Sequence, residues 1–180
     1  MSRFAIPDTV SGRDIRAIRK KLGMTQGEFA ELVHVSSKTI ERWETGKKEI
    51  TGPVTTLVKI LNEYPQIGED YVIPERIYPL RLWYMSENRV CTIIDVDERS
   101  RRVKVYNFTR DYMERAFGKE EHPDFEAYEA FLESRCFPES RDKMKLILKD
   151  LDLPFYDPLL IIEKTEGKMA EDDFWIRIER

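Results

Sequence analysis

Residues Leu22 to Thr45 decide the fold of the first part of the chain, and they read LGMTQGEFAELVHVSSKTIERWET. Thr25 and Ser36 are candidate N-caps, because a short hydroxyl side chain can accept a hydrogen bond from the free N–H groups of a first helical turn. The tripeptide Val33–His34–Val35 supplies a turn between them. The stretch therefore predicts a helix, a turn and a second, short helix.

Further helices are expected on both sides of this stretch. The first covers residues 11–22, where Ser11 is a candidate N-cap and Asp14 follows it at the spacing of a capping box. The last begins at Gly52–Pro53, because proline suits the first helical position, and stops at Pro65. The apolar residues expected to face the core are Ile15, Ile18, Leu22, Phe29, Leu32, Val33, Ile40, Trp43, Val54, Leu57, Ile60 and Leu61.

The short helix after the turn carries a polar face that suits DNA. Lys38 and Arg42 lie one turn apart, and Ser37 and Glu41 share their side of the helix. Such a row can enter the major groove, where Arg and Lys donate to guanine O6 and N7. Glu41 could accept from a cytosine amino group, or it could be a solvated side chain that supports Arg42 or Lys38.

A small helical bundle with solvated lysines and arginines would show the same amphipathic helices. The relative positions of four residues favour DNA binding instead, since they match the spacing that a helix-turn-helix requires. These residues are Gln26, Ala30, Ile40 and Trp43.

Residues 12–61 resemble the Cro/C1-type (Xre-type) helix-turn-helix, and more closely the transcription-regulating antitoxins of the HigA and MqsA kind. The segments GRDIRAIRKKLGMTQGEFAELV, TIERWETGKK and GPVTTLVKIL carry this resemblance. It implies that Arg19 pairs with Glu44 and so locks the first helix to the recognition helix. One departure is His34, at the turn position that the family usually fills with glycine. Histidine tolerates a positive φ better than most residues, so we expect modest strain.

The resemblance also implies roles at the DNA. Ser37, Lys38 and Arg42 would face base edges, and a dimer would bind an inverted repeat in double-stranded DNA with half-sites roughly 34 Å apart. Phosphate contacts position a protein without reading sequence. The residues expected to contact phosphates or to brace the reading helix are Arg19, Thr25, Gln26, Lys47 and Lys48.

The charge of the chain is unevenly distributed. The 180 residues carry a net charge of −4, but residues 1–63 hold eleven Lys and Arg against eight Asp and Glu, a net of +3. Residues 64–180 hold nineteen against twenty-six, a net of −7. The acidic part is expected to face away from DNA or toward a basic partner.

The second part of the chain changes to a period of two. Three runs, LRLWYMS, RVCTIIDVD and RRVKVYNF, have gaps of hairpin length and predict a three-stranded antiparallel meander. Helical signals follow, and the tail FWIRIER alternates like a final strand. The expected helices cover residues 109–118, 124–135, 138–151 and 157–167.

The predicted fold class is α+β: an N-terminal Xre-type domain of four to five helices, then a small antiparallel meander with C-terminal helices. The domains expected are a helix-turn-helix DNA-binding domain over 1–63, a linker over 64–78 and an α+β domain over 79–180 for dimerisation or partner binding. The linker holds two prolines and a glycine with little periodicity.

Signals for catalysis, cofactors, metals and membranes are weak. No Ser/His/Asp set, CxxC or phosphate-binding glycine loop is present, so we expect no enzyme, no catalytic residue and no cofactor. The acidic run Glu171–Asp173 could suggest a metal, but a solvated surface is commoner, and we expect no metal site. Cys91 and Cys136 form no disulfide framework. Without a signal peptide or an apolar run of about 18 residues, a cytoplasmic protein with no membrane contact is expected.

A second resemblance links residues 133–176 to a segment that precedes the kinase-like core in some HipA-like bacterial proteins. The sequence holds no kinase core, so we infer no phosphoryl transfer. The shared residues could equally cap and brace helices. They are Arg135, Pro138, Ser140, Arg141, Leu148, Leu151, Pro158, Gly167, Asp172, Trp175 and Ile176.

Three hypotheses follow. The first is a sequence-specific transcriptional regulator that acts as a dimeric repressor. The second is an antitoxin that represses its own operon and binds a toxin encoded nearby through its acidic C-terminal part. The third is a repressor that senses a small effector in a pocket, although aromatic residues on strands more often belong to a core. The residues that could line such a pocket are Trp83, Tyr84, Tyr106 and Phe108.

Overall fold

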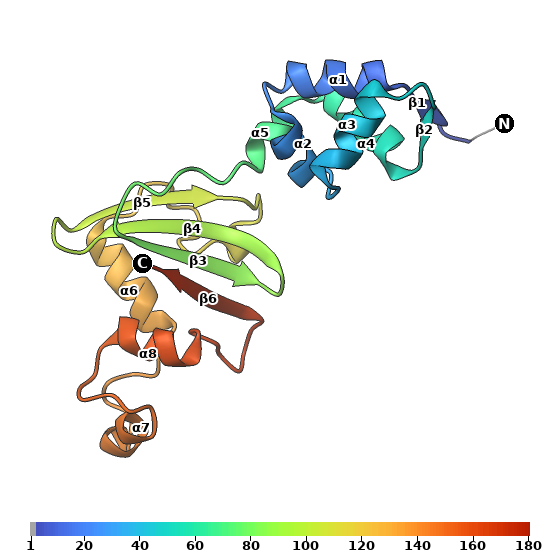
Figure 1. The fold of residues 1–180 in the computed structure, drawn as a ribbon. Coiled ribbons are helices and arrows are strands. Elements are labelled where there is room, and N and C mark those ends of the chain that lie inside the picture. The colour runs from blue at the N-terminus through green and yellow to red at the C-terminus, as the bar shows by residue number, and fades with distance from the viewer. Residues whose placement is uncertain (1–2) are drawn as a thin grey trace. The chain divides into compact units, whose positions relative to one another are not determined.

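The computed structural model describes residues 3–180 and shows two compact units, one that ends at Ile73 and one over Pro74–Arg180 (Figure 1). Helices make up most of the first unit, and the second combines an antiparallel sheet with helices. The predicted α+β class is confirmed. Among the described residues, no helix has the length and apolar character needed to cross a membrane.

Over residues 3–73 the first unit contains five helices and a short two-stranded ribbon. Both expected capping boxes are present, at Ser11 with Asp14 and at Thr25 with Glu28. The ribbon pairs Val10 with Ile50 and was missed, because two-residue strands leave no periodic pattern. The elements are β1 (Thr9–Val10), α1 (Gly12–Lys21), α2 (Gln26–Leu32), α3 (Ser37–Thr45), β2 (Ile50–Thr51), α4 (Pro53–Glu63) and α5 (Gln66–Asp70).

The core of this unit follows the predicted apolar faces except on α4. Ile15, Phe29 and Ile40 are fully buried between α1, α2 and α3. On α4 the prediction for Ile60 is wrong: its side chain is 38% exposed, while Val58 is buried. The inward stripe of α4 is therefore rotated toward Val58 relative to the one expected.

The expected linker over 64–78 contains secondary structure at its start. Helix α5 occupies Gln66–Asp70, and Ile67 packs against the core of the first unit. Gly68 lies close to Leu22, since a Cβ there would stand 3.3 Å from a Leu22 methyl group. The two compact units divide after Ile73, a position inside the expected linker.

The second unit is built on a four-stranded antiparallel sheet in the order β5-β4-β3-β6. The predicted meander forms three of the strands. The fourth comes from the C-terminal tail, which pairs with β3 so that Arg81 faces Glu179. The strands are β3 (Leu80–Ser86), β4 (Arg89–Asp97), β5 (Arg102–Asn107) and β6 (Phe174–Glu179).

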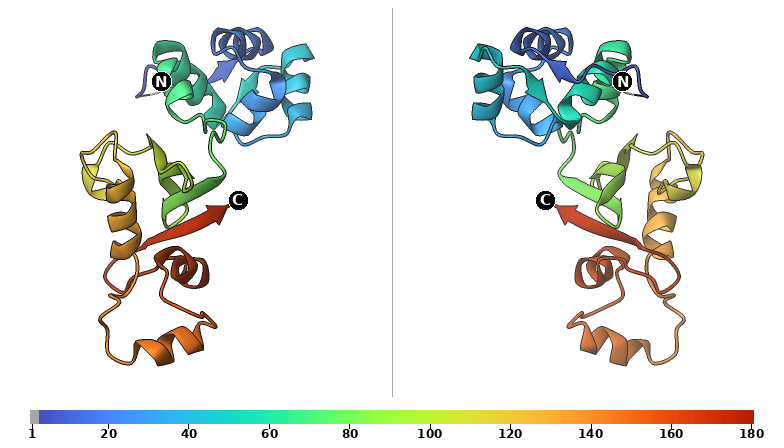
Figure 2. Two further views of the ribbon diagram at one scale, coloured as in Figure 1. Left: turned by 90° about the vertical axis from the view of Figure 1, so that its left-hand side faces the viewer. Right: turned by 90° about the vertical axis from the view of Figure 1, so that its right-hand side faces the viewer.

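Two helices, α6 (Phe125–Ser134) and α8 (Pro158–Thr165), pack on one face of this sheet (Figures 1 and 2). Tyr128 and Ile161 from these helices share a core with Leu82 and Ile94 of the sheet. The opposite face carries a smaller cluster around Trp83, Met85 and Ile93. The sheet thus separates two apolar clusters.

Two of the expected C-terminal helices differ from the structure. Over 109–118 there is only a 3-10 turn at Tyr112–Glu114, because the Thr109 hydroxyl accepts from the Asp111 N–H and donates to Glu114. Over 138–151 the helix α7 (Met144–Asp150) begins late. Lys143 has a φ of 61°, a left-handed conformation through which a right-handed helix cannot continue.

Candidate DNA-binding face

Helix α3 divides its residues cleanly between core and solvent. Ser36 caps it, since the Ser36 hydroxyl accepts from the Thr39 N–H at 3.2 Å. Ile40 is fully buried and Trp43 packs against the same core. The four residues predicted to contact bases are all exposed on the remaining face: Ser37, Lys38, Glu41 and Arg42.

The opposite side of α3 is held by one buried carboxylate. The Glu44 side chain is only 1% exposed. Arg19 donates to it twice, with Nε 2.6 Å from Oε1 and Nη2 3.0 Å from Oε2. Gln26 adds a third hydrogen bond at 3.0 Å and Arg16 a fourth at 3.3 Å. Helices α1 and α2 are thereby joined to the end of α3.

This network changes the acidity of Glu44. Hydrogen bonding by Arg19 is the main cause that lowers the pKa of Glu44 from 4.5 to about 2, and it outweighs the opposite effect of burial. Gln26 and Arg16 lower the pKa of the same carboxyl further. Glu44 is therefore ionised at neutral pH, as a carboxylate that accepts four charged or amide N–H donors should be.

The structure divides the residues expected at phosphates into two groups. Arg19 and Gln26 brace the motif through Glu44, and Arg19 also donates to the Met24 carbonyl at 3.0 Å. The expected pairing of Arg19 with Glu44 is present. The other three remain exposed: Thr25, Lys47 and Lys48.

The turn before α3 has the conformation expected from the departure at His34. His34 has a φ of 55°, and the Val35 N–H then donates to the Ala30 carbonyl at 2.9 Å. Histidine tolerates this left-handed geometry better than a β-branched residue does. The turn therefore closes without a glycine.

Sequence reasoning missed two residues that help to position α3. A Cβ on Gly12 would overlap the Trp43 carbonyl oxygen, so only glycine allows this approach of α1 to α3. Arg16, to which the sequence analysis assigned no role, donates to the Glu44 carbonyl at 3.2 Å. The one available signal was a glycine directly after an N-cap, a position with no helical need for it.

The candidate metal cluster has a structural role. Asp172 accepts two hydrogen bonds from the buried Arg135, at 2.6 and 3.0 Å, which lowers the pKa of Asp172. Arg135 also donates to the Gly167 carbonyl at 3.0 Å. Within residues 3–180, no group of three His, Cys, Asp or Glu side chains is placed to hold a metal ion.

The aromatic residues considered for an effector pocket do not converge. Tyr84 lies in the main core beneath α6, where it stacks on Phe174. Trp83 belongs to the cluster on the opposite face of the sheet, with Tyr106 and Phe108 packed against it. The hypothesis of one pocket lined by all four is therefore wrong.

Comparison with known proteins agrees with this geometry. Residues 15–71 match a family model described as helix-turn-helix. The chain is 39% identical over 57 residues to antitoxin HigA-2 of Vibrio cholerae serotype O1. The aligned segment covers 32% of this chain and 55% of that protein. The chain thus spans about half the length of the curated relative it matches. Residues 15–71 are a Cro/C1-type helix-turn-helix domain.

Proposed function

We propose that this protein is a sequence-specific transcriptional regulator, a repressor that binds an inverted repeat as a dimer. The observation that carries the proposal is the exposed polar stripe of α3 on a helix fixed by the buried Glu44 network. A rigid reading helix is what base discrimination needs, because each bidentate contact depends on side-chain placement.

The base contacts come from α3. Lys38 and Arg42 donate to guanine O6 and N7, with Ser37 and Glu41 at neighbouring positions on the same stripe. Thr25, Lys47 and Lys48 contact phosphates and set the register. Arg19 and Gln26 act through Glu44, by holding α3 in place.

An exposed apolar strip on the same unit supports the dimer. Ile60 on α4 and four residues around α5 leave large apolar side chains in solvent, and such strips commonly pack against another protein surface. A second copy would bury the strip and place two reading helices on successive turns of one DNA face. The strip consists of Ile60, Tyr64, Tyr71, Val72 and Ile73, whose exposed fractions are 38%, 52%, 63%, 56% and 48%, respectively.

Footprinting of the full-length protein on the DNA upstream of its own gene is the first test. A protected inverted repeat would supply the cognate site. The double variant Lys38→Ala with Arg42→Ala should then lower affinity for that site by about 100-fold, but affinity for random DNA much less. The control variant Arg13→Ala with Lys20→Ala removes the same charge from exposed positions of α1. Equal losses on both DNAs in the α3 variant would refute base reading.

A second candidate function is that of an antitoxin. It is supported by the net charge of −7 over residues 64–180 and by the relative named antitoxin HigA-2. In that function the second unit binds a basic toxin encoded nearby. Co-expression of the full chain with each neighbouring gene product tests it: a stable complex and relief of toxicity are expected, and failure with every neighbour would exclude it.

A further inference from the structure

A cavity of about 390 Å³ lies in the second unit, between the turn after β4, helix α6 and the start of α8. Its lining is unusually acidic. Of the carboxylates that line it, only Glu129 forms an ion pair within the described residues, with Arg101 at 3.1 Å. The four carboxylates that line the cavity are Glu98, Glu129, Glu133 and Asp157.

Tyr128 contributes an unpaired polar group to the same cavity. Its side chain lines the cavity and is 1% exposed. The hydroxyl has no hydrogen-bond partner within the described residues, whereas buried hydroxyls nearly always have one. Burial raises the pKa of Tyr128, and Glu98 and Asp157 raise it further. The hydroxyl thus stays protonated, close to two carboxylates and able to accept a hydrogen bond.

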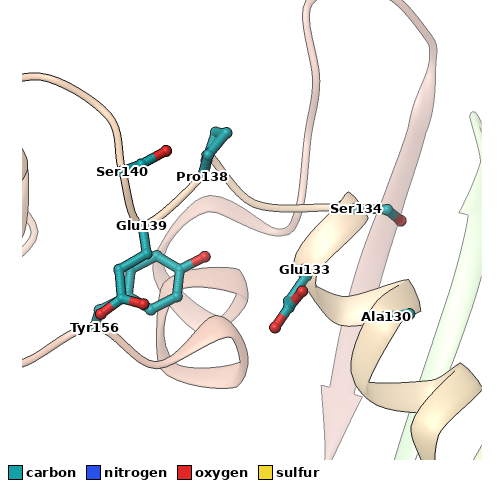
Figure 3. Close-up of a pocket in the computed structure, with 7 residues that line it drawn as sticks. All are labelled: Ala130, Glu133, Ser134, Pro138, Glu139, Ser140 and Tyr156. Atoms are coloured by element: carbon teal, nitrogen blue, oxygen red, sulfur yellow. The ribbon is translucent and has the colours of Figure 1, made fainter.

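The acidic surface continues into a second cavity along α6. This cavity of about 740 Å³ shares Glu133 with the first and adds Glu139 and Tyr156 (Figure 3). In Figure 3, Glu133 on α6 faces Tyr156 across the space, with Pro138 and Ser140 along another side. We call the two cavities together the acidic groove; its carboxylates are Glu98, Glu129, Glu133, Glu139 and Asp157.

Charge and geometry define what fits this groove. An anion would be repelled, and no three ligand side chains are placed for a metal ion within residues 3–180. A guanidinium or ammonium group satisfies the lining, because it donates to carboxylates and to a tyrosine oxygen at once. The two cavities share Glu133 as a lining residue and together exceed the size of one such group, so the occupant is a chain that carries more than one cation.

We propose that the acidic groove binds a basic polypeptide segment and takes one Arg or Lys side chain beside Tyr128. This site gives a place to the binding of a basic partner that the second candidate function requires, and it does not depend on DNA binding. The partner is recognised by positive charges spaced along an extended stretch, with the inserted side chain as the anchor at Tyr128.

Fluorescence anisotropy with the full-length protein and a labelled peptide Ala-Arg-Ala-Ala-Arg-Ala tests the groove. Saturable binding is expected, and the same peptide with citrulline in place of arginine should not bind. Glu98→Gln with Glu133→Gln should weaken binding by about tenfold. The control Glu171→Gln with Asp173→Asn removes equal charge at exposed positions outside the groove and should change binding by less than about twofold. Equal weakening, or no binding to the wild type, would overturn the proposal.

Tyr128→Phe tests the anchor separately. It removes only the hydroxyl, so the thermal stability should be unchanged or higher, because an unsatisfied buried group is lost. Peptide binding should nevertheless weaken by about threefold or more. Unchanged peptide affinity would refute insertion at Tyr128. Competition by argininamide or spermidine at concentrations similar to the peptide would refute the polypeptide assignment in favour of a small amine.

Discussion

Arg19 and Glu44 join the first helix of the helix-turn-helix domain to the last turn of α3 through two parallel hydrogen bonds, of 2.6 and 3.0 Å. Glu44 lies two residues after the exposed Arg42 on the same helix. The orientation of the face proposed to read DNA is therefore set by a carboxylate on its hidden side. A bidentate, charge-assisted pair is well suited to this, because it fixes direction as well as distance.

Replacement of this carboxylate should cost much of the stability of the first unit. Glu44→Gln leaves the guanidinium of Arg19 without its counter-ion, and removal of one partner from a buried pair typically costs about 3 kcal/mol. Calorimetric unfolding of the full chain measures the effect. Glu41→Gln, on the exposed face of the same helix, should change stability by less than about 0.5 kcal/mol. Similar effects of the two variants would contradict a special role for Glu44.

The same pair predicts a pH dependence. The pKa of Glu44 is lowered from 4.5 to about 2 in the folded protein, chiefly by Arg19. A lowered folded pKa stabilises the fold above the unfolded pKa, and this contribution is lost as pH falls from 4.5 toward 2. The stability difference between wild type and Glu44→Gln should therefore shrink over that interval. A difference that stays constant across it would show that the charge of Glu44 is not the cause.

Gly12 and Gly27 both lie in helices, but replacing each by alanine should change the stability of the unit in opposite directions. A Cβ at Gly12 would overlap the Trp43 carbonyl oxygen, so Gly12→Ala should push α1 from α3 and destabilise the unit by about 3 kcal/mol. A Cβ at Gly27 would meet only the Thr25 hydroxyl, at 3.8 Å. Gly27→Ala should stabilise by about 0.5 kcal/mol or slightly more, because alanine loses less backbone entropy. Urea unfolding of both variants is the measurement, and destabilisation by both would contradict the packing argument.

In the second unit a buried ion pair ties the segment before β3 to the sheet. Arg81 and Asp95 lie on neighbouring strands, with Arg81 Nε 2.6 Å from Asp95 Oδ1. Their side chains are 5% and 0% exposed, respectively. Arg81 also donates to the Pro74 carbonyl, and the Ile77 N–H donates to Asp95. Asp95→Asn should destabilise this unit by about 3 kcal/mol.

The control for that pair is Asp97→Asn on the same strand. Asp97 pairs with Arg102, whose side chain is 59% exposed, so its loss should cost less than about 1 kcal/mol. Calorimetry of the full chain compares the two variants. Equal, small effects would mean that the buried pair contributes little beyond an apolar substitute of the same size.

What the sequence could predict was local. The caps at Ser11, Thr25 and Ser36 and the three meander strands all rest on residues a few positions apart, and they are present. The exposed stripe of α3 also follows from helical spacing, because burial of Ile40 places Lys38 and Arg42 outward.

What the sequence could not predict depends on pairs distant along the chain. The role of Arg16 exists only because Glu44 points inward, which no local pattern records and which only the family resemblance implied. The 109–118 segment has a helical pattern, but it folds as a loop in which Glu114 accepts a hydrogen bond from Arg89 and the Ala116 N–H donates to the Thr92 hydroxyl, both on β4. Tertiary contacts outweigh helix propensity there.

The two lysines after α3 give a last prediction, on the salt dependence of DNA binding. Lys47 and Lys48 are exposed directly beyond Gly46, which ends the helix. If each neutralises one phosphate, Lys47→Ala should weaken binding to cognate and random DNA alike and reduce the salt slope by about 1. Lys38→Ala should instead weaken binding to cognate DNA more than binding to random DNA, since the proposed partner of Lys38 is a base. Titrations at four salt concentrations separate the two, and an unchanged slope for Lys47→Ala would remove that lysine from the phosphate contacts.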